Sequence, residues 1–204
     1  MQSYRELIEE HTRANLLRSF GVEPRSKVLL TGPPGNGKTS LAEAIATVLM
    51  VPLYVVKYEA LIDSYLGETA SRLDTLFSFA RTQPCVLFFD EFETLGKERG
   101  DRHESGEIKR VVSSLLLQID ALESHAIVIA ATNHESLLDM AAWRRFLIKL
   151  RLEGPTLETL KAWLASFEER TSFSFDISLE ALASKLLGRS YAEVEDFALA
   201  VYRQ

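Results

Sequence analysis

Short apolar runs alternate with segments of helical periodicity along most of the chain. Runs that are rich in β-branched and aromatic residues and bounded by turn residues predict five strands, at residues 28–31, 53–58, 86–89, 127–131 and 147–152. Apolar residues at helical spacing predict helices before and between them, at residues 4–20, 40–50, 69–82, 107–120 and 137–143. Strands that alternate with helices form a parallel sheet covered on both faces, so the pattern predicts an α/β fold.

The pattern changes after Gly154 and Pro155, because the remaining residues show helical periodicity only. Helices are expected at residues 156–170, 178–187 and 190–202, and Ser190 with Glu193 forms a capping box at the start of the last one. We therefore expect a large α/β subdomain at residues 1–153 and a small helical subdomain at residues 154–204.

A phosphate-binding loop follows the first predicted strand. Gly32, Gly37, Lys38 and Thr39 fit the pattern G-x-x-x-x-G-K-[ST], in which backbone N–H groups surround phosphate oxygens at a helix N-terminus. The lysine of this pattern reaches the β- and γ-phosphates, and the hydroxyl after it binds Mg²⁺. The other predicted contacts to the nucleotide in this stretch are Pro34, Gly35, Asn36 and Ser40.

Two carboxylates, Asp90 and Glu91, end the third predicted strand. Asp90 suits Mg²⁺, which it would bind through a water molecule, whereas Glu91 is placed to polarise a water for attack on the γ-phosphate. Asn133 follows the fourth strand, where a neutral amide can orient the same water without competing for its proton. Because functional residues gather at the carboxyl ends of parallel strands, these residues predict one site for ATP and Mg²⁺.

Composition narrows the classes of function. With 204 residues, 47% of them hydrophobic and 25% charged, the composition is that of an ordinary globular protein. No apolar run approaches the roughly 20 residues that span a bilayer, and the N-terminus lacks the apolar core of a signal peptide, so we expect a cytoplasmic protein without a membrane segment. The net charge of −6 disfavours sequence-independent binding to nucleic-acid phosphates, so no nucleic-acid partner is expected.

The motifs together resemble those of the AAA+ ATPases, in the branch that includes FtsH, katanin and spastin. GPPGNGKT at residues 32–39 is similar to the family's GPPGTGKT, FFDEFETL at 88–95 to its DEID-type motif, and AATN at 130–133 to its sensor-1 strand. The resemblance implies a P-loop NTPase fold with a helical lid, ATP hydrolysis with Mg²⁺, and assembly into a homo-oligomeric ring, most often a hexamer. It also implies the sensor-1 role for Asn133.

Two further segments carry roles that the resemblance implies. Residues 138–146, LDMAAWRRF, resemble the family's LDPAxxRRF, whose arginines reach into the nucleotide site of a neighbouring subunit. By implication Arg144 and Arg145 are arginine fingers. Tyr65, Leu66 and Gly67 are similar to the aromatic-hydrophobic-Gly loop that lines the family's central pore, and a tyrosine ring suits contact with an extended peptide of any sequence.

The chain also departs from the family pattern. It begins after the place where the family's D-[IV]-G-G motif would lie, so we expect an ATPase module that lacks an N-terminal part. Tyr191 stands where the family's G-x-S-G-A-[DE] has a small glycine, which leaves open whether Arg189 acts as a sensor-2 arginine. Met140 replaces the family's usual proline.

The motifs are compatible with three functions. The first hypothesis is an ATP-hydrolysing ring motor that remodels, unfolds or threads protein substrates through a central pore, with any proteolysis supplied by a separate protease or adaptor partner. The alternatives are a nucleic-acid-handling ATPase of the clamp-loader or helicase-loader type and an ATP-gated scaffold without turnover. The acidic charge and the Arg144-Arg145-Phe146 motif speak against the loader, and the Asp90-Glu91 pair speaks against the scaffold.

Overall fold

A computed structural model of the chain describes residues 2–56, 66–93, 106–138 and 140–203. The chain divides into two compact units. The first unit comprises Met1–Thr31 and Lys38–Arg151, and the second comprises Gly32–Gly37 and Leu152–Gln204. The phosphate loop is thus part of the same unit as the C-terminal helices.

The first unit contains a sheet of five parallel strands in the order β2-β3-β4-β1-β5, as the alternating pattern predicts. The strands are β1 (Lys27–Thr31), β2 (Leu53–Val56), β3 (Cys85–Phe89), β4 (Ala126–Thr132) and β5 (Ile148–Arg151). In the register of the sheet, Thr31 lies opposite Thr132 and Phe89 opposite Ala130. The carboxyl ends of β1, β3 and β4 therefore lie at one edge of the sheet.

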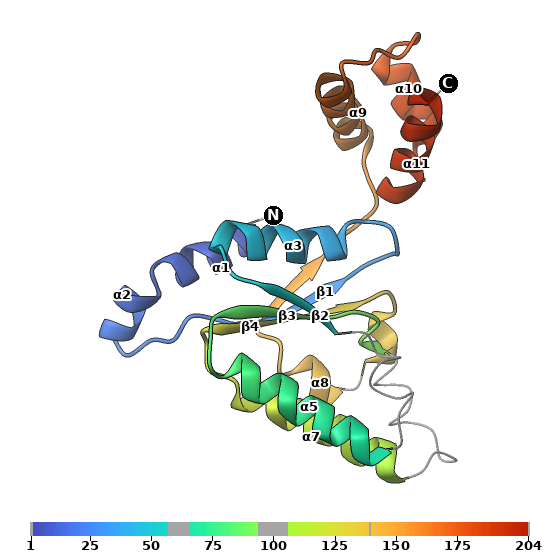
Figure 1. Cartoon of the computed structure of the whole chain (residues 1–204). Helices are drawn as coiled ribbons and strands as arrows, with labels where there is room; N and C mark the ends of the chain where they lie inside the picture. Colours follow the sequence, from blue (N-terminus) through green and yellow to red (C-terminus); the bar gives the residue numbers. More distant parts are fainter. Residues whose placement is uncertain (1, 57–65, 94–105, 139, 204) are drawn as a thin grey trace. The chain divides into compact units, whose positions relative to one another are not determined.

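Helices cover both faces of the sheet (Figure 1). One face carries α1 (Gln2–Thr12) and α3 (Lys38–Leu49), and the other carries α5 (Leu66–Ala80), α7 (Gly106–Ala121) and α8 (Met140–Trp143). The short helix α2 (Ala14–Ser19) follows α1. Every residue of β3 and β4 is buried, as expected for apolar strands covered on both sides.

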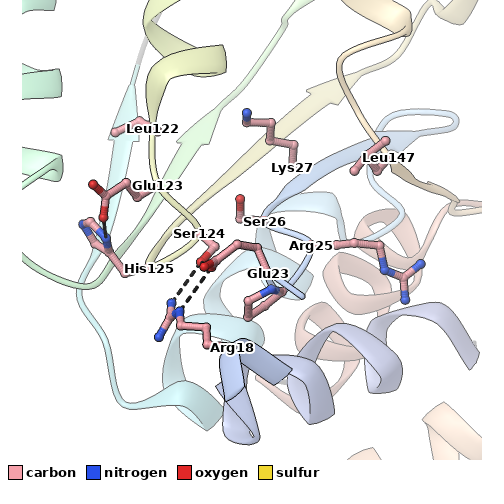
Figure 2. Close-up of a pocket in the computed structure, with 11 residues that line it drawn as sticks. Arg18, Glu23, Arg25, Ser26, Lys27, Leu122, Glu123, Ser124, His125 and Leu147 are labelled. Carbon is pink, nitrogen blue, oxygen red and sulfur yellow. Dashed lines mark hydrogen bonds and ion pairs between the residues drawn. The ribbon is translucent and has the colours of Figure 1, made fainter. Parts of the chain in front are cut away.

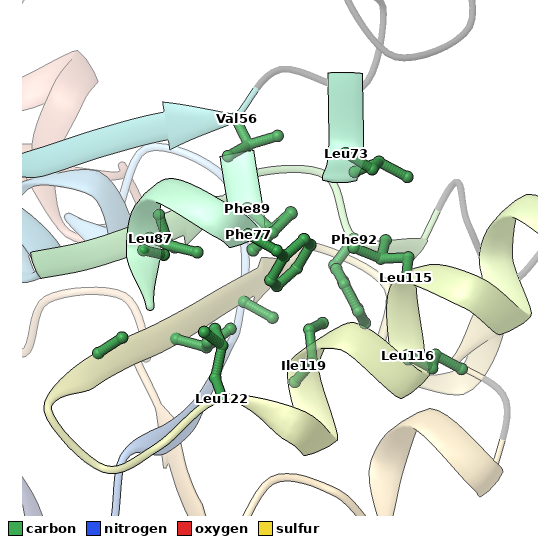
Figure 3. Packing of buried hydrophobic residues seen from close by; sticks show 14 of the residues in the cluster. Val56, Leu73, Phe77, Leu87, Phe89, Phe92, Leu115, Leu116, Ile119 and Leu122 are labelled. Atoms are coloured by element: carbon green, nitrogen blue, oxygen red, sulfur yellow. The ribbon is translucent and has the colours of Figure 1, made fainter. Parts of the chain in front are cut away.

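Aromatic side chains connect the end of β3 to the segment before β5. Phe77, Phe89 and Phe92 lie in the core between the sheet and helices α5 and α7 (Figure 3). The ring of Phe92 contacts Phe89 edge-on with centroids 6.1 Å apart, and it contacts Phe146 edge-on at 5.5 Å. Because Phe92 follows Glu91 and Phe146 follows Arg145, these ring contacts fix the backbone beside two of the predicted functional segments.

The second unit contains three helices, α9 (Leu157–Thr171), α10 (Leu179–Leu186) and α11 (Tyr191–Tyr202). Their apolar faces share a small core. The predicted capping box of Ser190 and Glu193 opens α11, since each side chain bonds the backbone N–H of the other residue.

Two predicted helices differ from the structure at their ends. The helix predicted at residues 137–143 is divided into a 3-10 turn, η1 (Glu135–Leu137), and α8, because Leu138 between them has an extended backbone with ψ of 130°. Helix α5 begins at Leu66 rather than at residue 69, so Leu66 and Gly67 belong to a helix rather than to a loop.

Candidate nucleotide-binding site

At two positions, the backbone of the phosphate loop has a conformation and surroundings that only glycine allows. Gly32 has a φ of 132°, and a Cβ atom there would lie 2.0 Å from the carbonyl oxygen of Leu152. Gly35 has a φ of 73°, and its Cβ would lie 2.8 Å from Oγ of Ser190. The loop therefore follows a path that combines left-handed backbone with close contacts to the C-terminal segment.

The loop also bonds to the first turn of α11. The carbonyl oxygen of Gly35 accepts a hydrogen bond from the N–H of Ala192 at 3.0 Å, and Oδ1 of Asn36 accepts one from the N–H of Tyr191 at 3.3 Å. The first N–H groups of a helix have no partner within the helix, so these two acceptors satisfy them. Asn36 is 6% exposed. The sequence pattern assigned it only to the nucleotide and gave no sign of this second contact.

A cavity of about 550 Å³ borders this contact within the second unit. It is lined by Pro33, Pro34, Gly35, Asn36, Gly154, Pro155, Gly188, Arg189, Ser190 and Glu193. Arg189 forms an ion pair with Glu193 at 3.0 Å, and both side chains are largely exposed. Such a surface pair contributes little to stability.

Lys38 begins α3 and is only 7% exposed. Burial lowers the pKa of its ammonium group, and the carboxylates of Asp90 and Glu93 act in the opposite direction. A cation directly after a glycine loop, at the first position of a helix, can bind a phosphate group. Thr39 and Ser40 are exposed in the next positions of the helix.

Asp90 and Glu91 lie directly after β3. Oδ1 of Asp90 accepts a hydrogen bond from the N–H of Glu91 at 2.9 Å. Glu91 is exposed and has a φ of 50°, which costs a residue with a Cβ about 1–2 kcal/mol. Strain of this kind gathers at functional sites, where the surrounding structure holds it, and it turns Glu91 away from the course of the strand.

Asn133 lies directly after β4 and is linked to a residue that the sequence reasoning did not select. Its backbone N–H donates to Oε1 of Glu93 at 3.2 Å. Glu93 is 4% exposed, and its Oε2 is buried without a hydrogen-bond partner in the described part of the chain, as is Oδ1 of Asn133. The signal available in the sequence was a third acidic residue, two positions after Glu91 and directly after Phe92.

The two predicted arginine fingers have different surroundings. Arg144 is exposed, whereas the side chain of Arg145 is 24% exposed and its Nε donates to Oδ2 of Asp120 at 2.8 Å. In the pore-loop segment, Tyr65 lies outside the described residues, and Leu66 and Gly67 form the first positions of α5.

A separate cavity of about 600 Å³ lies in the first unit, at the amino-terminal ends of β1 and β4 (Figure 2). Arg18 lines it and donates to Oε2 of Glu23 at 3.1 Å and to Oγ of Ser124 at 2.9 Å. None of the predicted site residues lines this cavity. It therefore lies at the opposite end of these strands from the candidate site.

Comparison with known proteins identifies the family. A family model described as "ATPase family associated with various cellular activities (AAA)" matches residues 28–153, which is more than half of the chain. The chain belongs to the AAA ATPase family. Its nucleotide site is therefore that of an ATPase, and the matched segment runs from the strand before the phosphate loop to the end of the large subdomain predicted from the sequence.

Individual relatives agree with the AAA assignment. The chain is 46% identical over 189 residues to the "Uncharacterized AAA family ATPase y4kL" of Sinorhizobium fredii, covering 93% of this chain and 57% of that protein. It is 37% identical over 176 residues to the "Peroxisomal ATPase PEX6" of Yarrowia lipolytica, covering 82% of this chain and 17% of that protein. It is 34% identical over 184 residues to the "ATP-dependent zinc metalloprotease FtsH 3" of Sphaerobacter thermophilus, covering 88% of this chain and 38% of that protein.

The chain thus spans little more than half the length of the first of these relatives and less of the other two. The similarity concerns the ATPase module that they share with it. Among the described residues, no helix has both the length and the apolar character needed to cross a membrane.

Proposed function

We propose that this AAA ATPase works as a subunit of a homo-oligomeric ring that remodels, unfolds or threads protein substrates. The ring that we propose is a hexamer. The observation that carries the proposal is that Asp90, Glu91 and Asn133 directly follow the neighbouring parallel strands β3 and β4 in a chain of the AAA family. Relatives named as an ATP-dependent metalloprotease and a "26S proteasome regulatory subunit 8 homolog" support a protein as the substrate. A separate protease or adaptor would then be a partner.

Each residue of the site has a role that its chemistry supports. Backbone N–H groups of residues 34–37 and the Lys38 ammonium would bind phosphate oxygens, and the Thr39 hydroxyl and Asp90 would hold Mg²⁺. Mg²⁺ supplies charge neutralisation at the β- and γ-phosphates. Glu91 accepts a proton from the attacking water, and Asn133 orients that water.

Lys38 is the cation that we assign to the site from the same chain, and we propose that a neighbouring subunit adds further positive charge at the γ-phosphate. Arg144 and Arg145 of that neighbour are the residues that we assign to this task, since a guanidinium offers several N–H donors to phosphate oxygens. Head-to-tail contacts of this kind form closed rings when the rotation between subunits allows closure. Tyr65, Leu66 and Gly67 are the proposed contacts to the substrate in the pore.

The test is to measure particle mass and ATPase rate together across a range of protein concentrations. A site completed by a neighbour predicts that the rate per subunit rises in parallel with assembly. If monomeric protein hydrolyses ATP as fast per subunit as the assembled protein, the proposal of a shared site is wrong. Acceleration of ATP hydrolysis by an unfolded protein, but not by DNA at physiological salt, would separate the remodelling function from the loader function.

A further inference from the structure

Glu93 is a buried carboxylate that the roles assigned so far do not use. Its backbone position is fixed by Phe92, whose N–H donates to the carbonyl oxygen of Ala131 in β4 at 2.9 Å and whose ring is buried between Phe89 and Phe146. The side chain of Glu93 is 4% exposed. The segment after β3 is therefore held against β4, with the Glu93 carboxyl group inside the protein.

The Glu93 carboxyl group is incompletely hydrogen-bonded, although the Lys38 ammonium lies close enough to attract its charge. Oε1 accepts one hydrogen bond, from the Asn133 N–H at 3.2 Å, and Oε2 has no hydrogen-bond partner among the described residues. Burying a carboxylate costs several kcal/mol unless its oxygens are well paired, and an apolar residue would avoid that cost. A buried group with unmet hydrogen-bonding capacity calls for a functional reason.

The same contact constrains Asn133. Its N–H is held by Glu93, and on its other side the Oγ1 of the fully buried Thr132 accepts a hydrogen bond from the N–H of His134 at 3.0 Å. The backbone of Asn133 is thus fixed on both sides, and its side-chain oxygen Oδ1 is buried without a partner. Glu93 and Asn133 are joined through the backbone N–H of Asn133, so each keeps a side-chain acceptor oxygen to which a water molecule can donate a hydrogen bond.

We propose that Glu93 is a positioning residue that fixes Asn133 for its contact with the attacking water. This inference rests on the proposed role of Asn133 in ATP hydrolysis. The hydrogen bond fixes the point at which the Asn133 side chain leaves the backbone, and small displacements of an orienting group slow a reaction strongly. Glu93 acts through Asn133 and takes no proton itself, in contrast to Glu91.

The test compares Glu93→Ala, Glu93→Gln and Glu93→Asp, with the exposed Glu43→Ala on α3 as the matched control. The first readout needs no ATP: hydrogen exchange at the Asn133 amide in nucleotide-free protein. We expect exchange about tenfold faster in Glu93→Ala, because the acceptor is lost, and near the wild-type rate in Glu93→Gln, whose amide oxygen accepts the same bond. In Glu93→Asp the side chain is shorter by one C–C bond of about 1.5 Å, so we expect its Asn133 amide to exchange as fast as in Glu93→Ala.

The second readout separates positioning from folding. We expect Glu93→Ala to lower kcat about tenfold or more while KM for ATP changes by less than about threefold, and Glu93→Gln to stay within about threefold of wild type. In an Asn133→Ala background, Glu93→Ala lowers kcat by no more than about twofold further, because the residue it positions is gone. Circular dichroism shows whether each variant is folded. If Glu93→Ala does not fold, the test uses Glu93→Gln in its place.

The outcomes are distinct. Equal loss of kcat in Glu93→Gln and Glu93→Ala would mean that the charge rather than the hydrogen bond matters, and the positioning role would be wrong. If kcat is low in Asn133→Ala but equals the wild-type value in Glu93→Ala, the role of Glu93 is overturned and the proposed function stays intact. A wild-type rate in Asn133→Ala would remove the role of Asn133 itself, and with it the reason for positioning.

Discussion

Arg145 is bound to its own chain: its Nε donates a 2.8 Å hydrogen bond to Oδ2 of Asp120, near the end of α7. Arg144, the residue before it, is exposed. The hydrogen bond to Asp120 orients the Arg145 guanidinium, which carries five N–H donors in a fixed geometry. The two arginines therefore differ in their surroundings: Arg145 is oriented by its own chain, and Arg144 is open to solvent.

The first prediction concerns these arginines. Arg144→Ala and Arg145→Ala should each retain nucleotide binding and lower kcat, by up to about 10³–10⁵ if they act as arginine fingers do in GTPases. Asp120→Ala should give a smaller loss, since Arg145 keeps its charge and loses only its orientation. Steady-state ATPase assays and a fluorescent-nucleotide binding assay check this prediction. The control is Arg13→Ala, which removes an exposed arginine that forms an ion pair with Glu9. Wild-type rates in both arginine variants would contradict the assignment.

The second prediction separates catalysis from backbone strain at Glu91. Glu91→Gln should bind ATP and hydrolyse it about 10²–10⁴ times more slowly, because an amide cannot accept the proton of the water. Glu91→Gly should be equally inactive but more stable by about 1 kcal/mol, because glycine adopts the φ of 50° without strain. Chemical denaturation of both variants, alongside single-turnover ATP hydrolysis, measures the two effects. A Glu91→Gln variant that keeps full turnover would place the base elsewhere.

The third prediction concerns pH. Burial lowers the pKa of His11, although its Nε2–H donates to the carbonyl oxygen of Arg25 at 2.9 Å and Glu10 is nearby. The folded state therefore favours neutral His11, and the unfolded chain binds more protons below its pKa of about 6.5. Stability should be fully present above about pH 6.5 and fall as the pH is lowered, by at most about 1.4 kcal/mol per pH unit for one group.

Urea titrations at pH 7.5, 6.5 and 5.5 check this slope. His11→Gln keeps an N–H donor and removes the titration, so its stability should change less over the same range. The Glu10 carboxyl group affects stability at lower pH. Burial favours a higher pKa for this group, but hydrogen bonds from Arg25 outweigh the burial and lower the pKa. Its contribution is therefore lost only below about pH 4.5. An unchanged slope in His11→Gln would refute the assignment.

The fourth prediction concerns Met50, which follows α3 with a φ of 55° and is 90% exposed. It occupies the left-handed position after the helix, with Val51 N–H donating to Ala46 O at 3.0 Å. Met50→Gly should raise the free energy of unfolding by about 1 kcal/mol, because glycine adopts this backbone without a Cβ penalty. Ala44→Gly, an exposed position inside the same helix, should lower it by about 1 kcal/mol. Thermal and urea unfolding of the two variants should thus move in opposite directions.

The sequence alone determined the parallel α/β fold, the phosphate loop and the carboxylates Asp90 and Glu91. These features depend on local pattern: a buried strand is a short apolar run, and G-x-x-x-x-G-K-[ST] carries its glycines and lysine within eight residues. The three helices at the C-terminus and the capping box of Ser190 are local in the same sense. Such features need no knowledge of which strand lies beside which.

Tertiary structure decided what joins these motifs. Glu93 meets Asn133, 40 residues away, because β3 lies beside β4, although a helix and a loop separate the two strands in the chain. Asn36 meets Tyr191 across 155 residues and caps α11. Hydrogen bonds between distant residues leave no periodic trace in the sequence, since each depends on strand order and on how completely a polar group is buried. For that reason the sequence alone assigned no role to Glu93, which the fold places, buried, against the backbone of Asn133.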